Sequence, residues 1–124
     1  MSEKQKTIYD MEDREVFSSV EYIVGRYNAE IVDSCISYNN GNKIGAVFLR
    51  NCKKTVKEDL ANDINNYLLG LSDMDGNKFT DIGDKERLVV FHVVRVNNSN
   101  FYSGMISNMK SYAKDKIVWL HKGL

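Results

Sequence analysis

Residues 88–96 (LVVFHVVRV) give the strongest strand signal in the chain, and this signal constrains the fold more than any other feature. The run is rich in β-branched side chains and almost entirely apolar, which is typical of a buried strand. We therefore predict that it lies in the middle of a sheet. Apolar residues at helical spacing over 103–114 and another apolar run over 116–121 follow it. This succession predicts a crossover unit with parallel strands and a right-handed connection.

A β-hairpin is predicted in the first half of the chain. Two largely apolar segments, 30–38 and 43–50, flank the sequence NNGN. Its Asn40 and Gly41 tolerate the positive φ angles of a tight turn, so we expect the two segments to pair as antiparallel strands. The second segment is apolar almost without interruption, which is typical of a strand covered on both faces.

Two amphipathic helices complete the first half. Over 12–28, apolar residues recur at positions i, i+4, i+7 and i+8, which is one face of a helix. A second helix is predicted to begin at Thr55, because Thr55 and Glu58 have the spacing of a capping box, and to end near Gly70. Residues 1–11 are expected to be a polar, frayed N-terminus.

The predicted order of elements is α-β-β-α-β-α-β, without an internal repeat. It indicates an α/β fold, with α+β as the alternative, in which helices pack on a mixed four-stranded sheet. The length of 124 residues, with 43% hydrophobic and 27% charged residues, fits a single domain over 1–124 with its own core.

The same order, from the helix at 12–28 to the closing strand KIVWL, resembles the small cytosolic domain that precedes the membrane helices in some Gram-positive rhomboid proteases. The catalytic serine and histidine of those enzymes lie in their membrane part. The resemblance therefore implies no catalytic residue in this chain.

Charge and composition narrow the classes of function. Lys and Arg together number 17, as do Asp and Glu, so the net charge is zero and the basic excess of a general nucleic-acid binder is missing. No apolar stretch approaches the ~18 residues of a membrane span, no apolar signal segment is visible, and two cysteines suit a reducing compartment. We therefore expect a cytoplasmic protein without a membrane span. The 12 lysines against five arginines, with 13 asparagines, use AT-rich codons and suggest a bacterial, phage or mobile-element gene.

The cysteines and histidines show no recognisable site. With the turn centred on the Asn-Gly pair, Cys35 lies opposite Ala46, and Cys52 lies too far along the ladder for a disulfide. The chain has no CxxC or HExxH spacing. We predict no catalytic residue, cofactor or metal site, and we interpret His92 as a buried core imidazole. An enzyme with a Cys–His pair assembled by the fold is a second alternative, because such pairs meet in space rather than in sequence.

The acidic segment 71–86 lacks the spacing of a calcium-binding loop. In an EF-hand loop the glycine takes position 6, so Gly76 would put Leu71 at position 1, where a carboxylate is required. We interpret the segment as a solvated connection.

Polar residues at two predicted strand ends suggest a different site. Ligands of parallel sheets bind beyond the carboxyl ends of strands, near helix N-termini. If strands 43–50 and 88–96 are parallel neighbours, the residues that follow them meet at one edge, which suits a small anion. This arrangement supports an alternative function, a small-molecule or anion-binding sensor or regulatory domain. Its candidate residues are Arg50, Asn51, Lys53, Thr55, Asn97, Asn98 and Ser99.

The charge is divided unevenly along the chain. Residues 1–84 carry 10 basic and 15 acidic side chains, a net charge of −5, and residues 85–124 carry 7 and 2, a net charge of +5. A basic surface of this kind steers an acidic partner. Our leading hypothesis is therefore a small non-enzymatic protein-binding module, a regulator, adaptor or inhibitor of a protein with an acidic surface. The candidate contact residues are Lys110, Lys114, Lys116 and Lys122, with the first two on one face of the 103–114 helix.

Overall fold

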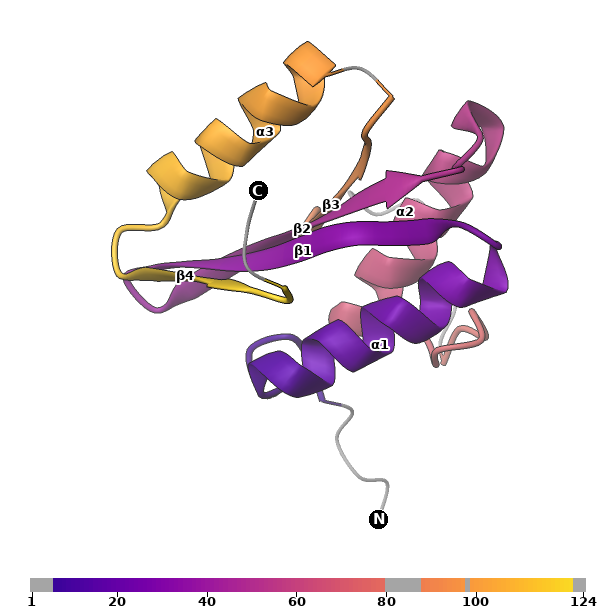
Figure 1. Cartoon of the computed structure of the whole chain (residues 1–124). Helices are drawn as coiled ribbons and strands as arrows, with labels where there is room; N and C mark the ends of the chain where they lie inside the picture. Colours follow the sequence, from indigo (N-terminus) through magenta and orange to yellow (C-terminus); the bar gives the residue numbers. More distant parts are fainter. Residues whose placement is uncertain (1–5, 80–87, 98, 122–124) are drawn as a thin grey trace.

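The computed structural model describes residues 6–79, 88–97 and 99–121 (Figure 1). In this part of the chain the elements follow the predicted order α-β-β-α-β-α-β, and they form a single α/β domain with a mixed four-stranded sheet. They are α1 (Asp13–Arg26), β1 (Glu30–Asn39), β2 (Asn42–Arg50), α2 (Lys54–Leu68), β3 (Phe91–Arg95), α3 (Ser99–Tyr112) and β4 (Lys116–Trp119).

The strands lie in the order β3-β2-β1-β4. The hairpin of β1 and β2 is antiparallel, and Cys35 pairs with Ala46 as the Asn-Gly turn predicts. β3 is parallel to β2, and β4 is antiparallel to β1. The two strands of the predicted crossover, β3 and β4, therefore run in the same direction but are separated by the hairpin.

The prediction that residues 88–96 lie in the middle of the sheet is wrong, because β3 is an edge strand. Its apolar composition reflects helices on both faces rather than strands on both sides. Phe91 and Val93 belong to the core under α1 and α2, whereas Val94 belongs to the core under α3. From Phe91 to Val94 the apolar side chains thus alternate between the two faces, whereas Val90, which precedes the strand, belongs to the same core as Phe91 and Val93.

A side chain of α2 closes the outer edge of β3 at its amino end. The amide oxygen of the buried Asn65 accepts hydrogen bonds from the backbone N–H groups of Val90 (2.8 Å) and Phe91 (2.9 Å). Its amide nitrogen donates to the carbonyl oxygen of Phe91 at 2.9 Å. On the inner side, the Phe91 ring packs so closely over Gly45 of β2 that a Cβ there would lie 2.0 Å from the ring.

The helices are unequally divided between the two faces of the sheet. α1 and α2 cover one face and α3 covers the other (Figure 1). The connection from β2 to β3 therefore passes over one face through α2, and the connection from β3 to β4 passes over the opposite face through α3. The two connections also lead toward opposite edges of the sheet. At the carboxyl ends of β2 and β3, the two connections thus leave the sheet over opposite faces and toward opposite edges. Parallel sheets usually have a ligand-binding crevice at such a point.

Three expected boundaries need correction. Residues 6–11 of the predicted frayed N-terminus are packed, because Ile8 is fully buried and its N–H donates to the carbonyl oxygen of Leu68 at 2.7 Å. The capping box does not form: α2 begins at Lys54, and the extended N-cap position belongs to Lys53, which makes no side-chain cap. α3 begins at Ser99, four residues before the predicted start, and ends at Tyr112.

Candidate functional site

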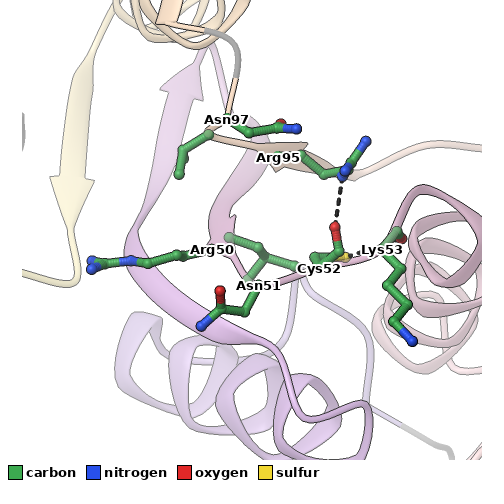
Figure 2. Close-up of a pocket in the computed structure, with 8 residues that line it drawn as sticks. Arg50, Asn51, Cys52, Lys53, Arg95 and Asn97 are labelled. Atoms are coloured by element: carbon green, nitrogen blue, oxygen red, sulfur yellow. Dashed lines mark hydrogen bonds between the residues drawn. The ribbon is translucent and has the colours of Figure 1, made fainter.

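A cavity of about 520 Å³ opens at the carboxyl ends of β2 and β3 (Figure 2). The predicted condition for an anion site, that these strands are parallel neighbours, is met. Four predicted candidates line the cavity: Arg50, Asn51, Lys53 and Asn97. The other lining residues are Leu49, Cys52, Arg95 and Val96.

The backbone around the cavity is held by two contacts between the strand ends. The N–H of Val96 donates to the carbonyl oxygen of Leu49 at 3.0 Å, which continues the parallel ladder past the end of β3. The Nε of Arg95 donates to the carbonyl oxygen of Cys52 at 2.7 Å (Figure 2). Between these contacts Asn51 adopts a left-handed conformation with φ of 57°, which turns the chain out of β2. An asparagine tolerates this conformation better than most residues.

The cationic side chains do not all point the same way. In Figure 2, Arg50 extends away from Lys53, and the Arg95 guanidinium lies on the same side of the cavity as Lys53. The Nε of Arg50 lies 3.9 Å from the Glu30 carboxylate in an exposed pair, which holds it only weakly. Lys53 and Arg95 therefore form the cationic side of the cavity, and a hydrogen bond fixes the second of them.

The surrounding helix ends add positive potential to this edge. The first turn of α2 contains no acidic residue and carries Lys54 and Lys57. The first turn of α3 contains no acidic residue either, whereas the first turn of α1 has Asp13 and Glu15. Because the N-terminal end of a helix is electropositive, cations there are unfavourable without a compensating anion. The two helices that begin at the cavity thus lack the stabilising acidic residues in their first turns, whereas α1 has them.

Neither cysteine is arranged for nucleophilic catalysis. Burial raises the pKa of Cys52, and the nearby Arg95 and Lys57 only partly offset this effect. Burial also raises the pKa of Cys35 to about 12. Both thiols are free, and raised pKa values keep them protonated and weakly reactive.

The Cys–His pairing left open by the sequence does not form between Cys35 and His92. Cys35 pairs with Ala46, and Ala46 pairs with His92. Cys35 and His92 therefore lie on either side of β2, two strand spacings or roughly 9.5 Å apart. His92 is half-buried rather than the buried core imidazole that the sequence predicts, and its partial burial lowers its pKa.

The other three predicted anion-site residues are not among the described residues that line the cavity. Thr55 is exposed on the first turn of α2 and is not among the lining residues. Ser99 is the first residue of α3, and Asn98 lies outside the described residues. Arg95 was missed because it belongs to the strand-forming run, but its position at the carboxyl end of a predicted parallel strand was a usable signal.

The described lysines among those predicted to form a protein-binding surface lie on different elements: α3, the turn after it, and β4. Lys110 is exposed in the last turn of α3, but the helix ends at Tyr112, so Lys114 does not share its helical face. The Nζ of Lys116 lies 4.7 Å from the centroid of the Tyr38 ring, in a cation–π contact on the hairpin. Lys122 lies outside the described residues. Binding to an acidic protein stays a prediction.

In the described part of the acidic segment, 71–79, the Asp73 carboxylate makes its hydrogen bonds to residues of the same segment. The carboxylate of Asp73 accepts hydrogen bonds from the backbone N–H groups of Asp75 and Asn77 and from the Asn77 side chain. These contacts, those with Asn77 above all, lower the pKa of Asp73. Among the described residues no group of three or more His, Cys, Asp or Glu side chains is placed to hold a metal ion.

Comparisons of the chain with protein families, curated proteins and solved structures give no match. The resemblance to the rhomboid cytosolic domain accordingly stays a prediction. Across the described residues, no helix combines the length and apolar character needed to cross a membrane. Fold and site together define an α/β domain with a cationic cavity where two parallel strands end.

Proposed function

We propose that this protein is a small-molecule-binding regulatory domain whose ligand is an anion held at the carboxyl ends of β2 and β3. The observation that carries the proposal is the cavity at the point where the two connections depart over opposite faces of the sheet. Cavities in this position are the usual ligand sites of parallel sheets. The cationic side chains on its wall determine the sign of the ligand's charge.

Lys53 and Arg95 have distinct roles in this proposal. The Arg95 guanidinium has five N–H donors in a fixed plane, and Cys52 takes one of them, so its orientation is set before a ligand arrives. Lys53 is exposed and supplies a mobile ammonium group on the same side of the cavity (Figure 2). A bound anion would neutralise both charges and the electropositive first turn of α2.

Binding would also change the stability of the domain. Lys53 belongs to the β2–α2 turn, and Arg95 and Asn97 belong to the end of β3 and the turn to α3. An anion that contacts both turns ties the two crossovers together. A ligand bound only by the folded state stabilises it by mass action, and the domain can thereby respond to the ligand's concentration. We further propose a cytoplasmic location, in which both buried thiols stay reduced.

The test is thermal unfolding in increasing inorganic phosphate, with ionic strength held constant by chloride. Phosphate also stabilises proteins non-specifically by exclusion from their surface, so variants decide the result. We expect a saturable rise in Tm for the native sequence and for Lys110→Gln, a matched loss of one exposed lysine on α3. The saturable part should vanish in Lys53→Gln/Arg95→Gln. An unchanged phosphate response in the double variant would contradict the proposal.

A further inference from the structure

We infer that the anion is an organic phosphomonoester, a phosphate group attached to a carbon-containing body, rather than an inorganic ion or a simple carboxylate. This inference rests on the proposed function and concerns the class of ligand that the same cavity accepts. Three properties of the cavity support it: its volume, the number of positive groups on one side, and the uncharged residues that make up the rest of its wall apart from Arg50.

The volume exceeds what an inorganic ion needs. A phosphate ion has only five non-hydrogen atoms, held together by covalent bonds, whereas sites for small organic molecules measure about 300–1,000 Å³. The cavity measures about 520 Å³, within the range of sites for small organic molecules. A bare phosphate would therefore leave most of it to water.

The cationic side of the cavity matches a doubly charged tetrahedral group better than a carboxylate. Lys53 and Arg95 provide two full positive charges, and the first turn of α2 adds the partial charge of its N–H groups without an acidic residue. A phosphomonoester carries a charge of about −1.5 to −2 at pH 7 and three terminal oxygens that accept hydrogen bonds. One carboxylate would leave about one positive charge unpaired.

The remaining wall, apart from Arg50 beside the Glu30 carboxylate, suits an uncharged body. Val96 is half-buried and apolar, and the amides of Asn51 and Asn97 each offer a donor and an acceptor. Such groups recognise the hydroxyl groups of a sugar or the polar edge of a base. A sugar phosphate and a nucleoside monophosphate share the chemistry that the cavity selects.

Isothermal titration calorimetry tests the inference with five probes: inorganic phosphate, ribose 5-phosphate, adenosine 5′-monophosphate, citrate and adenosine. We expect at least one of the two phosphate esters to bind at least about tenfold more tightly than inorganic phosphate, and adenosine to give no detectable binding. Binding of both esters would indicate recognition of the sugar phosphate. Binding of the nucleotide alone would indicate that the base contributes.

The variant Asn97→Ala tests whether Asn97 contacts the carbon-containing body of the ligand rather than its phosphate group. This side chain is exposed, so its loss should leave the fold intact. We expect it to weaken the binding of the tighter-binding ester several-fold and to change the affinity for inorganic phosphate by no more than about twofold, because the amide contacts the body. The double variant Lys53→Gln/Arg95→Gln should abolish both.

The outcomes separate this inference from the proposed function. Equal affinity for inorganic phosphate and both esters, or binding of citrate without either ester, would overturn the inference and leave an anion site. Tight binding of adenosine, or binding of an ester that survives the double variant, would overturn both. Absence of binding by every probe would also overturn both.

Discussion

The two ends of the parallel pair β2 and β3 are built in opposite ways. At the amino end, the Phe91 ring covers Gly45, and the Asn65 amide satisfies the backbone of the outer edge. At the carboxyl end, the connections leave over opposite faces, and a cavity with cationic side chains lies between them. One end of the pair therefore contributes to stability, and the other end holds the cavity that we propose binds a ligand.

The largest expected effect is at the closed end. Phe91 is fully buried in the main core, so Phe91→Ala should lower the free energy of unfolding by roughly 3–5 kcal/mol. Denaturant unfolding measures this loss. A loss below about 1 kcal/mol would show that the closed end is not where the pair gains its stability.

The next effect tests the amide that closes the edge of β3. Asn65→Leu keeps the branched arrangement of the side chain's non-hydrogen atoms but leaves two buried N–H groups and one carbonyl oxygen without partners, which should cost at least about 2 kcal/mol. The same substitution at Asn62, half-buried on the same helix, is the matched control and should change stability by less than about 0.5 kcal/mol. Equal losses in the two variants would remove the special role of Asn65.

A smaller effect concerns the pH dependence that β3 contributes. Burial holds the pKa of His92 below its value in the unfolded chain, about 6.5. Below that pH the unfolded state binds more protons than the folded state, so stability should fall as the pH falls from about 7 toward the folded pKa. His92→Gln should remove this part of the pH dependence, as measured by denaturant unfolding at a series of pH values. Parallel pH profiles would contradict the burial of a neutral imidazole.

The smallest expected effect is at the open end, where a substitution should raise the free energy of unfolding rather than lower it. Lys54→Glu places an acid in the first turn of α2 and should raise the free energy of unfolding by about 0.3–1 kcal/mol. The same change should weaken phosphate binding, because it lowers the positive potential of the edge. Lys54→Gln should give an intermediate result in both measurements. A variant that loses stability and keeps its phosphate affinity would contradict the division between a stabilising end and a binding end.

Local features of the sequence predict much of this fold. The Asn40-Gly41 turn sets the hairpin register, and helical apolar repeats locate α1 and α2, because these signals act between near neighbours in the chain. The place of β3 in the sheet depends on packing between distant segments. A strand with helices on both faces has the same apolar composition at an edge as in the middle.

The candidate site was predictable only in part, for the same reason. Polar residues after two strands indicated Arg50, Asn51, Lys53 and Asn97, which line the cavity. Whether they meet depended on β2 and β3 being neighbours, which no local pattern fixes. Arg95 was hidden because its side chain alternates with the apolar residues of a strand.

The most direct test of the central claim is a titration of the isotopically labelled protein with inorganic phosphate, followed by the backbone amide signals in two-dimensional NMR. Phosphate should move the signals of residues 49–53 and 95–97 most, in a saturable way and at constant ionic strength. These are the two segments that line the cavity. The largest shifts at Lys110 and Lys116, or shifts that grow linearly over the whole surface, would show that the carboxyl ends of β2 and β3 are not an anion site.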